Sequence, residues 1–438
     1  MWGKNMDYSK IAERIDSSFD SWELFFLNEK MKKYECREKE LYGVELKEED
    51  GTALRGIKDG RMVFTYTYEN SDETADILLE NAKALLPFME KDADAGFPEK
   101  YEGYGKLDIY DNAGLACDDG YKTELLIDME KTILDFDKRI VVTRNCELQE
   151  SDIHVMMINS NGLRAASKKT LFTLFAMAVA KGDDEVSWYD WLWDHAFTNI
   201  NAKTFGAEVA QKTISFLSST QIDTGIYEGI LTPQASCDML EMLSQSFLGE
   251  NLYKDKTKLK GKENTKCFSE IINIRDSGLK GMDSFPFDGE GIPSGEQHIV
   301  KNGCFTAFLY DSYYGHKFGL SSTGNSVRWG IKEPPKCAPR CLFIEKGQRD
   351  ISRLMTNGVI IEELMGTHTA NPITGDFSLG AVGYLCRNGK KSPFNGVIFS
   401  GNIFELLNNV KEVGRDVRYY GTCGSPSLYV EEIKISGI

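Results

Sequence analysis

Histidine side chains are the first residues to consider for metal chemistry, because histidine is the commonest metal ligand in proteins. The chain has five of them, each isolated in the sequence: His154, His195, His298, His316 and His368. A helical zinc motif such as HExxH needs two histidines one turn apart on one helix face, and no such pair is present. An isolated histidine is more often a structural or surface residue than a ligand. Histidine spacing alone therefore predicts no metal site.

Cysteines are the second group that could bind a metal or act as nucleophiles. Ten of them are scattered along the 438 residues. The start of the chain, Met1 to Asp20, lacks the apolar segment of a signal peptide. We therefore expect a cytoplasmic protein with reduced, mostly buried thiols. Cys337 and Cys341 form a CxxxC pair, but no histidine lies nearby and prolines surround it, which argues against a metal site there.

Other sequence features exclude several classes of function. There is no G-x-S-x-G elbow, no Walker-type loop and no dinucleotide-binding fingerprint. The formal net charge of -16 repels phosphate backbones and anionic lipid surfaces. The longest mostly apolar run, Leu171 to Ala180, is far shorter than the roughly 20 residues of a membrane helix. We therefore expect neither a nucleic acid nor a membrane as a partner.

Hydrophobic periodicity predicts the elements that must position any site in the first half. Helical periodicity predicts helices over residues 18–33, 71–86, 122–136 and 202–217. Alternation of apolar and polar residues predicts strands over 42–46, 61–68, 139–147, 152–158 and 164–180. The turn at Asn159 to Gly162 indicates that the strands on either side of it are antiparallel. Helices that alternate with antiparallel hairpins are typical of an α+β fold.

The second half has a different character, with short strands between Gly and Pro turns. Asn302-Gly303 and Asn388-Gly389 predict β-hairpins. One late helix is expected over residues 404–413, with Gly414 as its C-cap. We therefore predict an α+β chain of two domains. Residues 1–220 form an N-terminal α+β domain with an antiparallel sheet and helices, and residues 221–438 form a β-rich C-terminal domain.

Turns rich in Gly, Asn, Thr and Asp stand out in the second half, at residues 288–293, 322–325, 371–378 and 424–427. Taken singly, each is explained by turn chemistry, because Gly adopts positive φ and Asn, Asp and Thr bond to their own backbone. In their order and spacing, however, they resemble the TldD/PmbA metalloprotease family, historically called modulators of DNA gyrase. The GSPSL segment that begins at Gly424 resembles the TldE/PmbA branch. The resemblance covers nearly the whole chain.

The resemblance has a direct implication for zinc. In that family the TldD-like subunit holds zinc through an HExxxH motif and a cysteine, and the TldE-like subunit pairs with it without zinc. The corresponding stretch here runs from Leu240 to Gln245, so both histidine positions are replaced, while Glu241 falls at the general-base position. Leucine cannot bind zinc, and glutamine is a weak neutral ligand. The resemblance therefore implies no cofactor in this chain and a zinc ion in a TldD-like partner.

Cys423 instead resembles the TldD branch, because the segment Gly421-Thr422-Cys423-Gly424 is similar to the TldD-type cysteine segment. It is a candidate functional thiol, and the alternative is a small buried residue in a turn. Further candidates are the residues of two turns that could line a substrate chamber or a subunit interface. They are Asn371, Thr374, Gly375 and Asp376 in the first turn, and Gly424, Ser425, Pro426 and Ser427 in the second.

Three functions follow from these observations as alternatives. In the first, the chain is a TldE-like interaction subunit that pairs with a TldD-like chain and helps to hold an unfolded peptide for degradation or maturation. In the second, it is a homodimeric peptidase that uses Cys423 or Glu241 in a non-standard mechanism. In the third, suggested by the old family name, it is a binding protein that acts on gyrase or on toxin-antitoxin targets. The partner is therefore either a TldD-like subunit or a second copy of the chain.

Overall fold

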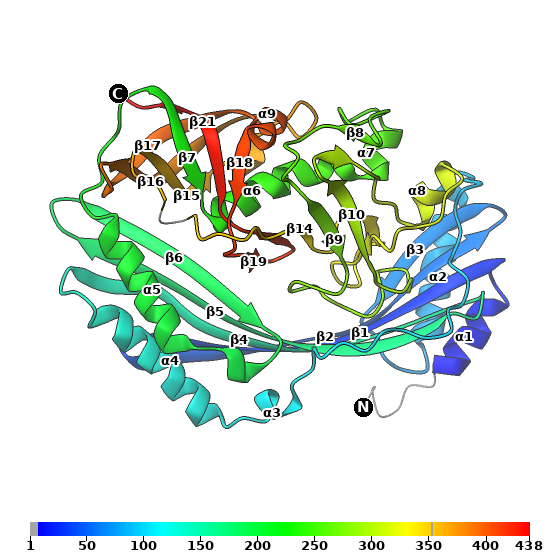
Figure 1. Ribbon diagram of the computed structural model, residues 1–438. Coiled ribbons are helices and arrows are strands. Elements are labelled where there is room, and N and C mark those ends of the chain that lie inside the picture. Colours follow the sequence, from blue (N-terminus) through cyan, green and yellow to red (C-terminus); the bar gives the residue numbers. More distant parts are fainter. Residues whose placement is uncertain (1–7, 352–353) are drawn as a thin grey trace.

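The computed structural model describes residues 8–351 and 354–438, and its first half is built on one six-stranded antiparallel sheet in the order β3-β2-β1-β4-β5-β6 (Figure 1). The strands are β1 (Ser21–Arg37), β2 (Glu40–Lys58), β3 (Arg61–Thr67), β4 (Ile140–Asn159), β5 (Arg164–Lys181) and β6 (Glu185–Asp194). The helices are α1 (Tyr8–Asp16), α2 (Thr74–Leu85), α3 (Asn112–Leu115), α4 (Asp119–Leu134) and α5 (Ala202–Ser215), with 3-10 turns at Leu86–Phe88 and Phe197–Asn199. The sheet is a long curved platform, with α4 and α5 under one end and α1 at the other (Figure 1).

The second half lies on the opposite face of that platform and contains two larger sheets (Figure 1). One has the order β17-β16-β15-β7-β21-β18, and β17 also pairs with β21, so that five of its strands close into a ring. Its strands are β7 (Gly225–Leu231), β15 (Gly358–Met365), β16 (Asp376–Arg387), β17 (Lys390–Asn402), β18 (Val410–Val413) and β21 (Leu428–Ser436).

The other sheet has seven short strands in the order β19-β20-β14-β9-β10-β11-β8. These are β8 (Thr265–Lys266), β9 (Ile274–Ser277), β10 (Glu296–Lys301), β11 (Cys304–Phe305), β14 (Leu342–Ile344), β19 (Arg418–Tyr420) and β20 (Cys423–Ser425). A separate ladder joins β12 (Ser326–Val327) to β13 (Lys336–Cys337). The helices are α6 (Pro233–Ser244), α7 (Gly249–Tyr253), α8 (Ser312–Lys317) and α9 (Ile403–Asn408), with 3-10 turns at Gln245–Phe247 and Thr367–Thr369.

These elements confirm the predicted α+β class, with the antiparallel sheet and helices in the first half and β-rich structure in the second. The division at residue 220 stays a prediction. No helix among the described residues is long and apolar enough to cross a membrane.

The prediction of a helix over residues 18–33 was wrong, because this segment is the central strand β1. Its residues Trp22 to Leu27 are all buried. Trp22, Leu24 and Phe26 pack with the helices beneath the sheet, whereas Phe25 and Leu27 pack on the other face. A strand buried on both faces has no polar face, so its sequence loses the period of two that identifies a strand.

Two other predictions were partly wrong. The helix predicted over residues 71–86 begins at Thr74, and Glu73 at its N-cap makes no side-chain capping bond. The helix predicted over 404–413 is α9, which ends at Asn408, and the remaining residues form strand β18 against β21. The segments predicted as two strands over 139–158 form one long strand, β4.

A buried ionic cluster joins the platform to the second half. Arg55 on β2 donates two hydrogen bonds to Glu23 on β1, at 3.0 and 2.6 Å, and one to Glu290 in the second half, at 3.1 Å. Arg328 in the second half also pairs with Glu23. Since buried charges are stable only when they are paired, this cluster favours one docking position of the two halves.

Candidate functional site

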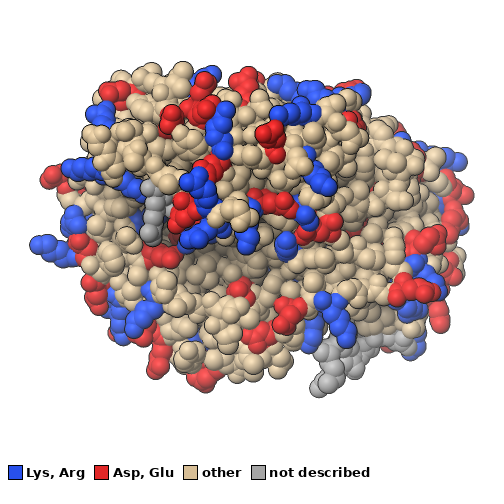
Figure 2. Space-filling model, viewed as in Figure 1, with Lys and Arg blue, Asp and Glu red and all other residues tan. Residues whose placement is uncertain are grey.

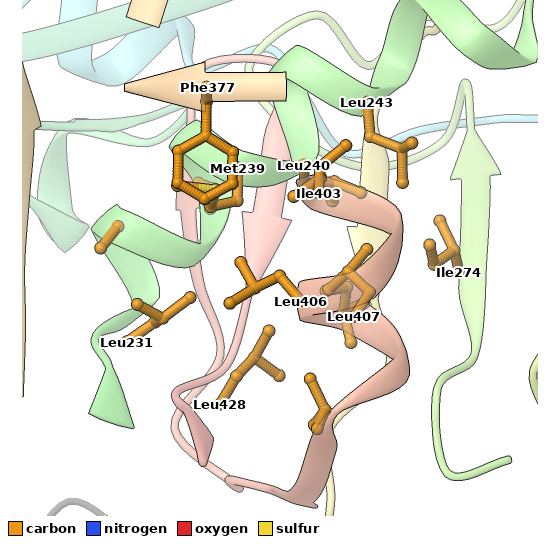
Figure 3. Close-up of a cluster of buried hydrophobic side chains, with 14 of the residues drawn as sticks. Leu231, Met239, Leu240, Leu243, Ile274, Phe377, Ile403, Leu406, Leu407 and Leu428 are labelled. Carbon is orange, nitrogen blue, oxygen red and sulfur yellow. The ribbon is translucent and has the colours of Figure 1, made fainter. Parts of the chain in front are cut away.

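Helix α6 carries Leu240 and Glu241 and leads into Gln245, so it holds the stretch that the resemblance predicts to correspond to the zinc motif. Thr232 caps its N-terminus by accepting a hydrogen bond from the amide of Ala235, and Pro233 occupies the first turn, where its missing N–H costs nothing. One face of the helix is apolar and packs into the largest core cluster, between the strand ring and α9 (Figure 3). Leu240 lies on this face and is only 1% exposed.

The opposite face of α6 borders a cavity of about 330 Å³, here called the α6 cavity. Glu241 and Gln245 are four residues apart and therefore lie on the same side of the helix. Both line this cavity, and Cys423 on β20 lines it as well. The full lining is Glu241, Ser244, Gln245, Leu248, Glu250, Asp283, Val327, Trp329, Lys336, Cys337, Ala338, Pro339, Arg340, Leu342, Thr422 and Cys423. The structure thus brings three of the predicted site residues together and excludes Leu240 from them.

A second cavity, of about 360 Å³, lies between the platform and the second half and is here called the sheet cavity. Its lining is Phe25, Leu27, Glu29, Glu49, Ile153, Val155, Met157, Lys169, Leu171, Asp283, Phe285, Phe287, Asp288, Gly289, Ser326, Val327, Arg328, Trp329, Gly330 and Arg340. Four residues line both cavities: Asp283, Val327, Trp329 and Arg340. The two cavities therefore adjoin, and together they are called the chamber below. Figure 2 shows a recess between the two halves and a surface on which acidic and basic side chains are interspersed.

The Cys423 thiol is protonated in this environment. Its side chain is buried, and burial, followed by the nearby Cys237 thiol and Glu241, raises the pKa of Cys423 well above its usual range. A thiol acts as a nucleophile or metal ligand through its thiolate form, which needs a positive neighbour or a metal. The geometry therefore gives Cys423 the properties of a buried structural residue that contacts a cavity.

Asp238 is a titratable group of α6 that the sequence analysis missed. Burial, then the charges of Glu241 and Glu363, raise the pKa of Asp238 to about 7. Glu363 on β15 is also buried enough that its own pKa is raised. The spacing of Asp238 and Glu241, three residues apart on a helix, was a usable signal for two carboxylates on one face. This part of the molecule can therefore exchange a proton near neutral pH.

The residues present do not fit a catalytic zinc ion, which needs three protein ligands and an open position. Leu240 has no ligand atom and lies in the core, and Gln245 falls in the 3-10 turn that ends α6. Throughout residues 8–351 and 354–438, no three His, Cys, Asp or Glu side chains are grouped so that they could hold a metal ion.

His195 has a structural partner at each of its ring nitrogens. Nδ1 of His195 lies 2.7 Å from the carbonyl oxygen of Thr170, and Nε2 lies 3.0 Å from Oγ of Ser284. Burial lowers the pKa of His195. This residue therefore links β5 to the second half as a neutral imidazole.

The turn that begins at Asn371 lies at the surface, where the carbonyl of Pro372 accepts a hydrogen bond from the hydroxyl of Ser246 at 3.3 Å. Oδ1 of Asn371 accepts the amides of Ile373 and Thr374, at 2.9 and 3.0 Å. Asp376 accepts hydrogen bonds from the hydroxyl of Thr374 at 2.6 Å and from Asn402 at 2.7 Å. The positive φ of 78° at Gly375 completes the turn. Asn371, Ile373 and Asp376 are exposed, and an interface role of this turn stays a prediction.

The turn from Gly424 to Ser427 is buried instead. Ser425 and Ser427 are 0% and 1% exposed. The hydroxyl of Ser427 donates to Asp416 at 2.6 Å, and the hydroxyl of Ser425 donates to the carbonyl of Pro426 at 2.9 Å. Gly424 pairs with Phe343 on β14 and with Tyr419 on β19. These residues hold β20 in its sheet, which places Cys423 at the cavity.

The chain has an α+β architecture with a chamber between its halves, and it carries turns at residues 288–293, 322–325, 371–378 and 424–427. These features define a class of protein that sequence comparison identifies. Profiles of PmbA/TldA metallopeptidases match in all three of their parts: domain 1 at residues 22–86, the central domain at 118–217 and the C-terminal domain at 224–437. The chain belongs to the PmbA/TldD metallopeptidase family.

Its relatives include proteins from archaea and bacteria. An uncharacterized protein of Methanocaldococcus jannaschii is 29% identical over 388 residues, which cover 86% of this chain and 87% of the relative. The metalloprotease PmbA of Escherichia coli O157:H7 is 28% identical over 340 residues, which cover 76% and 72% of the two chains. Over a shorter stretch of 258 residues, 53% of this chain and 56% of the relative, the zinc metalloprotease TldD homolog of Saccharolobus solfataricus is 25% identical.

Solved structures share the fold over almost the entire chain. The putative modulator of DNA gyrase from Thermotoga maritima has a TM-score of 0.89 and 24% identity, and TldE from Thermococcus kodakarensis has a TM-score of 0.89 and 23% identity. Each match covers 98% of this chain and 100% of the solved chain. At this level of identity the likeness establishes the fold.

Proposed function

We propose that this chain is a TldE-like subunit that carries no zinc and that pairs with a zinc-bearing TldD-like subunit to degrade or process unfolded peptides. The observation that carries the proposal is the orientation of α6. Its cavity face offers Glu241 and Gln245, whereas Leu240, at a ligand position implied by the family resemblance, packs into the core. A chain with this helix needs a second subunit to supply the metal.

The chamber supports a role in holding peptide. Its platform side is mostly apolar and includes Phe25, Leu27 and Val155, while Trp329 stands 61% exposed where the two cavities adjoin. Ligand cavities in proteins are commonly lined by apolar and aromatic groups with a few polar groups among them. An extended, unfolded segment presents both its backbone and its side chains to such walls, whereas a folded protein does not.

The test compares the purified chain alone with the chain mixed with a TldD-like subunit from the same organism. Zinc is measured by elemental analysis, and peptidase activity is measured on an unfolded peptide. We expect neither zinc nor activity in the isolated chain, and both in the mixture. The control is the TldD-like subunit with its metal histidines replaced, which should abolish the activity of the mixture. Stoichiometric zinc in the isolated chain would contradict the proposal.

A homodimeric peptidase with a non-standard site is the second candidate, because Glu241 and Cys423 share one cavity and Asp238 titrates near neutral pH. The double variant Glu241→Gln/Cys423→Ala separates the two candidates. The first candidate predicts that a mixture containing this variant keeps its peptidase activity. The second predicts that the isolated wild-type chain is active and that the variant is not.

A further inference from the structure

Arg340 is a buried cation at the junction of the two cavities. It lines both the sheet cavity and the α6 cavity, and it is only 6% exposed. Its guanidinium donates from Nη1 to the hydroxyl of Ser294 at 3.2 Å and from Nη2 to the carbonyl of Asp283 at 3.3 Å. Both acceptors are neutral. An arginine side chain has five N–H donors in a planar fork, so donors remain for a further acceptor in the chamber.

The other cations that line the chamber from buried positions have carboxylate partners. Lys169 pairs with the carboxylate of Asp283 at 3.1 Å, and Arg328 pairs with Glu23. For Arg340, in contrast, no carboxylate within residues 8–351 and 354–438 is close enough to form an ion pair. A buried charge without an ion-pair partner is costly, and such a charge at a cavity is a feature of sites that bind an oppositely charged ligand.

The charge of Arg340 acts to lower the pKa of Asp276, Asp283 and Asp288, but none of these carboxylates contacts its guanidinium. The carboxylate of Asp283 pairs with Lys169. Asp276 instead accepts backbone amides, from Arg340 at 2.9 Å and from Cys341 at 3.2 Å, and the side-chain amide of Asn325 at 2.6 Å. Asp288 accepts the amides of Glu290 and Ile292, each at 2.9 Å. These carboxylates are engaged with their own loops, so the free donors of Arg340 remain available to the chamber.

We propose that Arg340 binds a carboxylate of the peptide in the chamber, either its C-terminal carboxylate or an Asp or Glu side chain. The proposal rests on the proposed function in that it requires a peptide in the chamber. Arginine suits this ligand, because its planar fork forms paired, charge-assisted hydrogen bonds with a carboxylate. Glu29 and Glu49 repel an anion in the sheet cavity, whereas Asp283, the acidic residue that lines both cavities beside Arg340, is paired with Lys169 at 3.1 Å.

The test is direct binding to the full-length chain, measured by fluorescence anisotropy with a short labelled peptide of Gly, Ser, Ala and Leu. Four forms of the probe are compared: with a C-terminal carboxylate, with a C-terminal amide, and as the amide with one internal Glu or one internal Gln. We expect a form with a carboxylate to bind roughly ten- to hundredfold more tightly than its neutral counterpart. The acid–amide pair and the Glu–Gln pair then distinguish the two sources of the carboxylate.

Variants assign the preference to Arg340. Arg340→Gln should remove the preference for the carboxylate and leave the affinity for the neutral peptide unchanged, and Arg340→Lys should keep part of the preference. Arg387→Gln is the matched control, because Arg387 is 70% exposed on the hairpin of β16 and β17 and should leave the preference intact. A preference that persists in Arg340→Gln would overturn the proposal.

The affinities of the wild-type chain for the four probes test the proposal even if Arg340→Gln fails to fold. Equal affinity of the wild-type chain for all four probes would overturn the role of Arg340 and leave the subunit proposal standing. Absence of any binding would also overturn it. The zinc and activity measurements on the mixture test the subunit proposal independently of these outcomes.

Discussion

Replacing Glu290 by glutamine tests whether the buried ionic cluster holds the two halves together. Oε1 of Glu290 accepts a hydrogen bond from Arg55 at 3.1 Å, and Oε2 accepts the backbone amide of Ser312 at 2.9 Å. The side chain is buried, as is Arg55. A glutamine has the same shape, but it carries no charge and can accept only one of these two bonds while its NH₂ group faces the other donor.

The magnitude follows from the groups left without a partner. Loss of the charged bond to Arg55 costs about 1.5–3 kcal/mol, and a buried amide without an acceptor costs about 1–3 kcal/mol. Part of this loss is offset. Burial, followed by the charge of Glu290, raises the pKa values of Asp288 and Asp311 to about 7, so removal of that charge relieves a repulsion. We therefore expect Glu290→Gln to lower the free energy of unfolding by about 2–4 kcal/mol.

The assay is chemical denaturation at neutral pH, followed by both fluorescence and circular dichroism so that coincident transitions establish two-state behaviour. The matched control is Glu431→Gln. Glu431 pairs with Lys411 at 3.0 Å on the surface, where both side chains are about half exposed, so its loss should cost less than about 1 kcal/mol. A loss of less than about 1 kcal/mol for Glu290→Gln would refute the reasoning, because the cluster would then contribute no more than a surface pair.

Three further predictions concern α6 and the rim of the chamber. Burial raises the pKa of Asp238 from 3.8 to about 7, so the folded chain keeps a proton on Asp238 that the unfolded chain loses, and this stabilising contribution is lost as the pH rises from about 4 through about 7. Asp238→Asn should therefore flatten the fall in unfolding free energy between about pH 4 and pH 7, and parallel pH profiles would contradict this. We expect the double variant Leu240→His/Gln245→His to bind no stoichiometric zinc, as measured by elemental analysis. It should also unfold more easily than wild type, because residue 240 faces the core. Zinc binding by this variant would show instead that residue 240 reaches the cavity. Because Trp329 is exposed, Trp329→Ala should change the unfolding free energy by no more than about 0.5 kcal/mol. It should nevertheless weaken peptide binding in anisotropy titrations, and an unchanged affinity would show that Trp329 is not part of the peptide site.

Local chemistry explains which parts of the fold could be predicted from sequence. At Asn302-Gly303 and Asn388-Gly389 both residues adopt positive φ, between 49° and 75°, which is the conformation that a two-residue hairpin requires and that these residue types favour. The turn at Asp59-Gly60 has the same geometry. Such signals need no knowledge of the rest of the chain, so the hairpins were predicted correctly.

Tertiary contacts explain what could not be predicted. Strand β1 has apolar residues on both faces because the helices cover one face of the platform and the second half covers the other, and neither cover is visible in its own sequence. Residues 410–413 form a strand because β21 lies beside them. In each case the packing partner, rather than the local pattern, determined the secondary structure.

The site shows the same limit. The family motif pointed to Glu241, Gln245 and Cys423, and these residues do share a cavity. Arg340 was missed, since one arginine among the charged residues of a sequence is indistinguishable from the others until its burial and its partners are known.

The two faces of helix α6 place different demands on their residues. The core face of the helix is set by residues such as Met239, Leu240 and Leu243, which pack with the strand ring and α9 (Figure 3). The cavity face carries no comparable packing, because Glu241 and Gln245 border open space. Substitutions at Glu241 and Gln245 on that face therefore cost little stability, whereas a change at Leu240 disturbs the core packing that holds the helix in place.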